Sequence, residues 1–141
     1  MMNITLHRAK GSTFIAKGDS NHWVVIDSAK QFGGSEAASK PMELVLIALG
    51  SCTAMDVESL INKMRTPADE FHLHVQAEQR DEHPKIFTKI HLTFIFKGEN
   101  LNKANIEKAV KLSHDKYCSV SAMLSKSATI SYDILYNPDT V

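Results

Sequence analysis

The feature that most constrains the fold is a long apolar segment in the first half of the chain. Residues 44–55 are apolar almost all round, and only small polar residues and Cys52 interrupt them. Pro41 suits the first turn of a helix because its missing N–H costs nothing there, and Glu43 is well placed against the helix dipole. We therefore expect a long helix from about residue 40 to residue 65, buried on most sides at the centre of the fold.

Shorter segments on either side of this helix alternate as strands do. Residues 3–8, 12–17 and 22–27 are three such runs, and the glycine and asparagine residues between them are typical of turns. They predict an N-terminal β-meander. In residues 71–80 and 87–97 apolar side chains recur at every second position, with a Pro-containing turn between the two runs, which predicts a β-hairpin.

A second helix and a last strand complete the predicted order of elements. Asn102 can cap a helix whose apolar positions recur every three or four residues, up to Ser113. A short helical turn follows Cys118, and residues 128–134 alternate again. The whole pattern predicts an α+β fold in one domain over residues 1–141, a length that buries about two-thirds of the unfolded surface.

Charge and hydropathy exclude several classes of partner. Sixteen basic residues balance sixteen acidic ones, and no long run of like charge indicates a nucleic-acid ligand. The longest uninterrupted apolar run, residues 44–49, is far shorter than the ~20 residues of a membrane span, and no signal sequence is indicated at the N-terminus. We expect a cytoplasmic protein without a membrane partner or a cofactor, whose two cysteines are free or redox-active.

The two cysteines are the main candidates for chemistry. Cys52 lies inside the apolar helix, where a thiol taken alone is simply a small hydrophobic side chain with a raised pKa. Cys118 is expected at a helix start, where free backbone N–H groups and the nearby Lys116 favour the thiolate. If the two sulfurs meet in space, they can form a reversible disulfide through a sulfenic acid.

No metal site is predicted. Neither cysteine belongs to a short-spaced ligand pair, so a zinc site has little support from the spacing. His72, His74 and His91 could share an outward sheet face and bind a metal there, but a solvated sheet face is the simpler interpretation.

Two separated motifs resemble those of the OsmC/Ohr family of osmotically induced and organic-hydroperoxide-resistance proteins. The first motif is PMELVLIALGSC at residues 41–52, and the second is YCSV at residues 117–120, followed by the closing strand. The resemblance covers essentially the whole chain. It implies an OsmC-like fold in which two chains interweave into a homodimer with sites at the interface.

The resemblance also implies a thiol-dependent peroxidase. By position, Cys52 would attack the O–O bond of a small organic hydroperoxide and become a sulfenic acid, and Cys118 would condense with it to a disulfide. A dithiol reductant would then restore both thiols. The family's peroxidases also use an arginine that pairs with the glutamate corresponding to Glu43. This chain has no arginine in the matching loop, so it resembles a divergent branch, with Arg8 or Arg80 as the substitutes.

The carboxylates near Cys52 differ in their expected positions. Glu43 lies nine residues before Cys52, so a straight helix places the two on opposite faces unless it bends near Gly50. Asp56 lies four residues after Cys52 and shares its face, where it opposes thiolate formation or accepts a proton.

Two other functions stay open beside the peroxidase. The first is a non-catalytic protein of the same fold that binds an apolar ligand or senses thiol oxidation. The second, thiol-dependent acyl transfer, has less support because no histidine has a spacing that suggests a base for Cys52.

Overall fold

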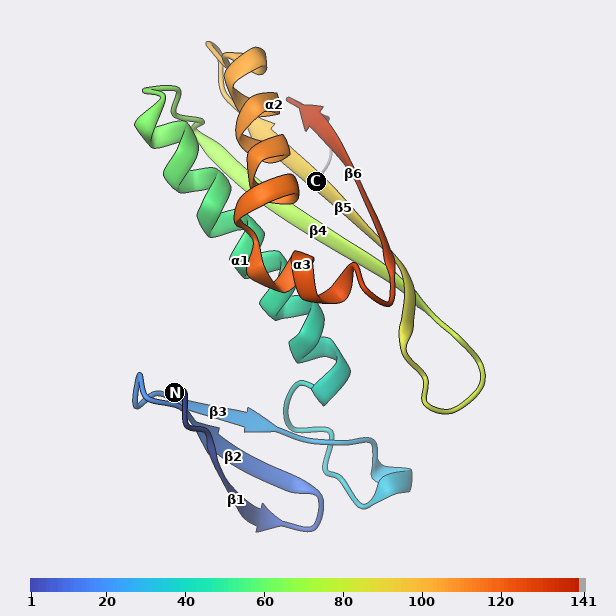
Figure 1. The fold of residues 1–141 in the computed structure, drawn as a ribbon. Helices are drawn as coiled ribbons and strands as arrows, with labels where there is room; N and C mark the ends of the chain where they lie inside the picture. Colours follow the sequence, from blue (N-terminus) through green and yellow to red (C-terminus); the bar gives the residue numbers. More distant parts are fainter. Residues whose placement is uncertain (140–141) are drawn as a thin grey trace. The chain divides into compact units, whose positions relative to one another are not determined.

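The computed structural model describes residues 1–139 of the chain, and Figure 1 shows the order of its elements. The chain divides into two compact units within its longest helix, residues 1–47 and the part from Ala48 onward. The prediction of one domain over residues 1–141 stays a prediction. The elements are β1 (Thr5–Lys10), β2 (Thr13–Lys17), β3 (Trp23–Ile26), η1 (Lys30–Phe32), α1 (Pro41–Lys63), β4 (Glu70–Gln79), β5 (Phe87–Lys97), α2 (Lys103–Leu112), η2 (Ser113–Tyr117), α3 (Ser119–Leu124) and β6 (Thr129–Tyr136).

The first unit contains an antiparallel sheet in the order β1-β2-β3, which confirms the predicted meander. Few of its side chains are buried. Ala16 is buried, whereas Leu6, Val24 and Val25 are exposed and Trp23 keeps 51% of its surface accessible. Since a small sheet gains stability by covering a hydrophobic face, this sheet needs a further packing surface.

A buried carboxylate organises the loop that follows this sheet. Asp27 is 1% exposed, and its oxygens accept hydrogen bonds from the backbone N–H groups of Ser28 (2.8 Å), Ser35 (3.1 Å) and Ala37 (3.0 Å) and from the Thr13 hydroxyl (3.1 Å). The bond from Ala37 contributes most to lowering the pKa of Asp27 below its ordinary value. The hydrogen bonds that this carboxylate accepts therefore fix the loop.

The second unit contains a sheet in the order β4-β5-β6. β4 and β5 are antiparallel, which confirms the predicted hairpin, and β6 is parallel to β5. Parallel neighbours need a crossover connection, and here α2, η2 and α3 supply it. The alternating apolar residues of β5 form the centre of the core, since Ile90, Leu92, Phe94 and Phe96 are at most 1% exposed.

The helices of this unit cover one face of its sheet (Figure 1). α1 lies over β4, where a Cβ added to Gly50 would be 3.2 Å from Cγ2 of Val75. On the β6 side, the His114 ring packs edge-on against Tyr132, with 5.2 Å between the ring centroids. Gly50 thus permits the close approach of α1 to the sheet, and the other helices cover its opposite edge.

α1 confirms the predicted helix through the apolar segment, although it ends at Lys63 rather than near residue 65. We expected burial on most sides. In the single chain burial is confined to one stripe, because side chains off that stripe, such as Met55 at 72% exposure, meet no neighbouring layer. The buried residues of the helix are Leu49, Thr53, Val57 and Ile61. By length and composition α1 could cross a membrane, but core helices of soluble proteins have the same properties.

The buried carboxylate generates a first prediction, on pH. Because the folded pKa of Asp27 is depressed, its contribution to stability is complete above the unfolded pKa of about 3.9 and is lost as the pH falls through the folded value. An Asp27→Asn substitution should remove this pH dependence. It should also speed amide hydrogen exchange at Ser35 and Ala37 by at least about tenfold at neutral pH, because a charged acceptor is lost.

Glu36→Gln is the matched control, since Glu36 lies in the same loop and its carboxylate contacts Lys30 at the exposed surface. Its amide exchange should equal that of the wild type. Equal exchange in the Asp27→Asn variant would contradict the anchoring role.

Candidate functional site

The candidate site begins on one face of α1. Cys52 and Asp56 are four residues apart, so one helical turn places them on the same side, and both are half-buried. Thr53, beside Cys52 in sequence, belongs to the buried stripe of the helix and is 1% exposed. This stretch of α1 therefore turns a thiol, a hydroxyl and a carboxylate toward the interior of the second unit.

A π-helical turn places the second cysteine against this face. α2 continues into η2, where the N–H of Cys118 donates to the Ser113 carbonyl oxygen at 2.9 Å, a bond across five residues. The chain then becomes extended at Cys118 (φ −69°, ψ 101°), which is the N-cap of α3. The predicted position of Cys118 at a helix start is confirmed.

These elements bring three reactive groups together. The Sγ atoms of Cys52 and Cys118 and a carboxylate oxygen of Asp56 all lie within 4.8 Å of one another. Both cysteines are free thiols, and Cys118 is the more deeply buried, with 3% of its surface accessible. The sulfurs are 66 positions apart in sequence, so their proximity is a product of the tertiary fold.

Hydrogen bonds hold this cluster in place. The sulfur of Cys118 accepts from the Thr53 hydroxyl at 3.2 Å and from the Ser121 N–H at 3.3 Å. Behind the carboxylate, the Ser113 hydroxyl donates to Oδ2 of Asp56 at 3.3 Å. Hydrogen bonds from α1, α3 and the π-helical turn η2 thus fix the Cys118 sulfur and the Asp56 carboxylate relative to each other.

The electrostatics of Cys118 differ from our expectation. We expected the helix start and Lys116 to favour its thiolate, but burial raises the pKa of the Cys118 thiol above its ordinary value. The hydrogen bonds from Thr53 and Ser121 lower this pKa, whereas neighbouring Cys52 raises it. Lys116 does not offset the effect of burial on the Cys118 thiol, because its ammonium lies over the Tyr117 ring, 5.4 Å from the centroid. Desolvation therefore outweighs the helix terminus, and Cys118 keeps its proton more firmly than a free cysteine.

The other two predicted site residues make contacts elsewhere. A carboxylate oxygen of Glu43 accepts from the Lys40 N–H at 2.9 Å and so caps the start of α1. Nε of Arg80 donates to the carbonyl oxygen of Pro84 in the turn between β4 and β5. Within the described residues 1–139, neither side chain has a hydrogen bond or ion pair with Cys52, Asp56 or Cys118.

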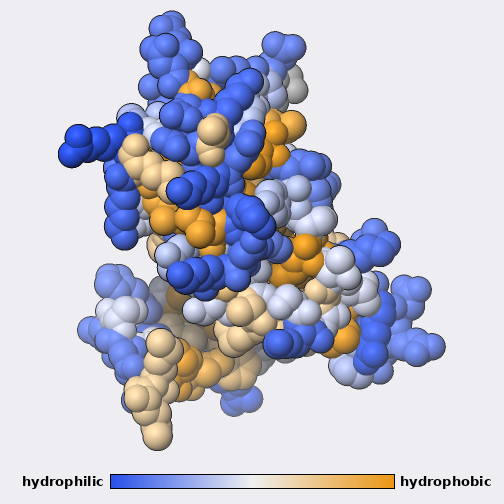
Figure 2. Space-filling model, turned by 45° about the horizontal axis from the view of Figure 1, so that its top comes forward, coloured by the Kyte–Doolittle hydropathy of each residue, from blue (hydrophilic) through white to orange (hydrophobic). Residues whose placement is uncertain are grey.

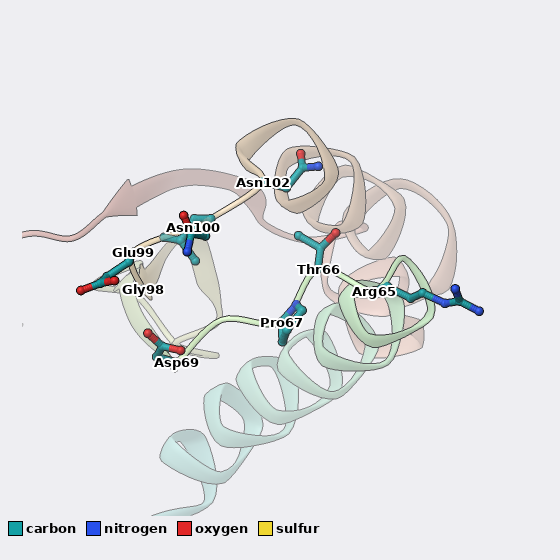
Figure 3. Close-up of a pocket in the computed structure, with 9 residues that line it drawn as sticks. Arg65, Thr66, Pro67, Asp69, Gly98, Glu99, Asn100 and Asn102 are labelled. Atoms are coloured by element: carbon teal, nitrogen blue, oxygen red, sulfur yellow. The ribbon is translucent and has the colours of Figure 1, made fainter.

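The second unit has several cavities. One of them, of 530 Å³, lies beyond the C-terminal end of α1 between residues 65–69 and 98–102. Figure 3 shows its polar lining, including Asp69 and Glu99, with the Arg65 side chain directed away from the carboxylates. No cysteine lines this cavity. Another, of 170 Å³, is lined by Asp56, Leu60, Lys63 and Tyr117 among others, so it adjoins the cluster.

Two of the three histidines considered for metal binding, His72 and His91, pair with neighbours on their sheet. Nε2 of His72 lies 3.1 Å from Glu70, and His91 lies between the Ser131 hydroxyl (2.8 Å) and Asp133 (3.3 Å). Over residues 1–139, the group of three His, Cys, Asp or Glu side chains close enough to share an ion is Cys52, Asp56 and Cys118.

Sequence reasoning missed the three hydrogen-bond donors of the cluster. Thr53 and Ser121 gave no sequence signal for this role. Ser113 did give a signal, because the helical periodicity placed it on the buried face of its helix, and a buried hydroxyl needs a partner. The helical periodicity does not identify Asp56 as that partner, because Asp56 lies on a different helix.

Comparison with known proteins supplies the wider context of this site. The sequence profile of the family described as OsmC-like protein matches residues 33–133. Protein YhfA of Escherichia coli K12 is 38% identical over 128 residues, which cover 89% of this chain and 92% of YhfA. A hypothetical protein from Aquifex aeolicus has a similar structure, with a TM-score of 0.81 and 28% identity over 98% of both chains. The chain therefore belongs to the OsmC-like family.

The fold also recurs in more distant relatives. An organic hydroperoxide resistance protein OsmC from Legionella pneumophila has a TM-score of 0.70 at 14% identity, and the match covers 96% of both chains. This similarity confirms the predicted α+β, OsmC-like fold.

The hydrogen bonds to Cys118 lead to a prediction on its titration. Thr53→Val keeps the side-chain shape but removes the hydroxyl that lowers the pKa of Cys118. In a Cys52→Ser background, the pH at which iodoacetamide alkylation of Cys118 reaches half its maximal rate should therefore rise.

Ser51→Ala is the control in the same background, because the Ser51 hydroxyl donates to the Ala48 carbonyl on α1 and not to a sulfur. Its midpoint should be unchanged. A midpoint that stays fixed or falls in Thr53→Val would contradict the assigned hydrogen bond.

Proposed function

We propose that this protein is a thiol-dependent peroxidase that reduces small organic hydroperoxides through Cys52 and Cys118. The observation that carries the proposal is the proximity of the two sulfurs, which lie within 4.8 Å of each other without being bonded. Disulfide formation requires this gap to close to the S–S bond length of about 2.05 Å. The name of the Legionella relative and the family resemblance agree with the proposed substrate class.

The accessibility of the sulfurs assigns them different roles in the first step. Cys52 is half-buried and Cys118 is buried with a raised pKa, so Cys52 is the sulfur that a substrate reaches and Cys118 stays protonated. The Cys52 thiolate attacks the terminal oxygen of ROOH, the O–O bond breaks, and RO⁻ leaves and takes up a proton. The products are ROH and the sulfenic acid of Cys52.

Cys118 completes the oxidation. Its sulfur attacks the sulfenic acid, an S–S bond forms, and the hydroxyl group of the sulfenic acid combines with the Cys118 proton to leave as water. A dithiol reductant then returns two electrons and two protons by thiol–disulfide exchange. The hydrogen bonds from Thr53 and Ser121 stabilise negative charge on Cys118 both as it attacks and as it leaves.

Asp56 is the proton acceptor in this scheme. Its carboxylate is close to both sulfurs, and the Ser113 hydroxyl fixes one of its oxygens. It can take the Cys52 proton before attack and supply a proton to the leaving alkoxide. The participation of Glu43 and Arg80 in activating Cys52 stays a prediction.

One observation favours a second candidate function, a thiol redox sensor without turnover. Asp56 has no ion pair with a lysine, arginine or histidine over the described part of the chain, so no cationic side chain paired with it is at hand to activate the neighbouring sulfurs. A sensor needs only one slow oxidation. Rapid multiple turnover with a hydroperoxide would exclude it.

A homodimer belongs to the same proposal. The first unit has few buried side chains, α1 exposes Met55, and Figure 2 shows hydrophobic patches at the surface between hydrophilic ones. A second copy of the chain would cover such surfaces, as the family resemblance implies.

The peroxidase proposal predicts distinct defects for the two cysteine variants. Cys52→Ser should lose hydroperoxide turnover by at least about a thousandfold, because the nucleophile is absent. Cys118→Ser should consume one equivalent of cumene hydroperoxide, accumulate a sulfenic acid that dimedone traps at Cys52, and fail to recycle with a dithiol.

Met55→Leu controls for the loss of an accessible sulfur, since Met55 is exposed on the same helix. It should keep full turnover. Full turnover in Cys52→Ser would end the proposal.

The dimer proposal predicts a particle of twice the 15.7 kDa chain mass in size-exclusion chromatography with light scattering. Met55→Glu and Trp23→Glu should each shift the protein toward the monomer, because a buried unpaired charge is costly at an interface. Lys126→Glu, at an exposed position, should leave the mass unchanged. A wild-type protein with the mass of one chain would refute the dimer.

A further inference from the structure

We propose that Cys52, Cys118 and Asp56 form a binding site for one thiophilic divalent cation, of which Zn²⁺ and Cd²⁺ are the representatives. The proposal concerns the reduced protein and stands whether or not the chain is a peroxidase. Its basis is the juxtaposition of two thiols and one carboxylate, whose ligand atoms all lie within 4.8 Å of one another.

The spacing of these atoms is close to that of a zinc coordination sphere. Zn–S bonds of about 2.3 Å and Zn–O bonds of about 2.1 Å in tetrahedral geometry place neighbouring ligands about 3.5 to 3.8 Å apart. The three groups therefore need to approach by at most about 1 Å to coordinate one ion. Three protein ligands leave a fourth position for water.

The donor set selects the class of metal. Thiolates favour Zn²⁺, Cd²⁺ and Cu⁺ over hard cations such as Mg²⁺ and Ca²⁺, which prefer oxygen ligands alone. A single carboxylate beside two sulfurs suits a borderline cation better than a hard one. On the outer sheet face, His72 is engaged with Glu70, and His91 with Ser131 and Asp133.

Hydrogen bonds already orient two of the three ligands. Thr53 and Ser121 donate to the sulfur of Cys118, and these bonds persist when the sulfur becomes a thiolate. Ser113 donates to Oδ2 of Asp56, which leaves the other carboxylate oxygen available to a metal. Partners behind the ligands are a regular feature of metal sites, because they fix ligand orientation before the ion arrives.

The charge of the three ligands also favours a bound cation. Asp56 and the two sulfurs, once deprotonated, place three negative charges in one partly buried cluster, and such charges are costly to hold together without a cation. Within residues 1–139, no cationic side chain forms an ion pair with Asp56 to offset this cost. A divalent cation neutralises most of the charge: M²⁺ replaces two thiol protons, which leave to solvent, and no electron is transferred.

The consequence is a protected state of the cysteine pair. With both sulfurs bound to the metal, Cys52 cannot attack a peroxide and Cys118 cannot condense with a sulfenic acid. Metal binding and disulfide formation therefore exclude each other.

The test is calorimetric titration of the reduced full-length protein with Zn²⁺ alone, alongside Cd²⁺ titration monitored by the thiolate-to-metal charge-transfer absorption. One ion per chain should bind, with release of thiol protons. Cys52→Ser and Cys118→Ser should each weaken Zn²⁺ binding at least a hundredfold, and Asp56→Asn at least tenfold. Glu58→Gln, an exposed carboxylate two residues from Asp56 on α1, should bind as the wild type does.

Several results would overturn the proposal. These are the absence of saturable binding, wild-type affinity in either cysteine variant, and wild-type affinity in Asp56→Asn. His91→Gln separates the site from the sheet face, and loss of binding in that variant would also count against it. Peroxide turnover is measured separately, on the metal-free protein. If turnover is absent, the Zn²⁺ affinities of these variants still decide whether the metal site exists.

Discussion

The packing of Cys118 against one face of α1 is the contact on which the rest of the site depends. The Thr53 hydroxyl and the Ser121 N–H both donate to its sulfur, which joins the long helix to the start of α3. Without this contact, Cys52 and Asp56 would be a thiol and a carboxylate on a helix surface. With it, a second sulfur lies close to both, and the proposed peroxidase chemistry and the proposed metal site both depend on that proximity.

Burial gives the two thiols unequal properties. Desolvation raises the pKa of Cys118 more than its two hydrogen bonds lower it, whereas Cys52 remains accessible. This difference suits the proposed mechanism, in which the accessible Cys52 reacts with the peroxide first and the protonated Cys118 then attacks the sulfenic acid. The same inequality makes the cluster costly to ionise in full, which is why a divalent cation is a chemically reasonable occupant of the reduced state.

The parts of the fold that depend on local periodicity could be predicted from the sequence. Pro41 marked the start of α1, the alternation in β5 identified its buried face, and Asn102 capped α2. The parallel pairing of β6 with β5 was not predicted, because alternation reveals a strand but not its neighbour.

The site was predictable only in part, for the same physical reason. The spacing of Cys52 and Asp56 places them on one helix face, but the π-helical turn that directs Cys118 toward them has no local sequence signal. The pKa of Cys118 was expected to fall because its helix start was considered alone. Its burial is a tertiary property, and no residue near it in sequence reveals that property.

The central claim is that the two sulfurs of one chain react with each other when the protein meets a peroxide. The most direct measurement treats the reduced protein with stoichiometric cumene hydroperoxide, or separately with hydrogen peroxide, and maps the products by peptide mass analysis. The account predicts a rapid Cys52–Cys118 disulfide with the organic peroxide. Recovery of both thiols in the reduced state would contradict it.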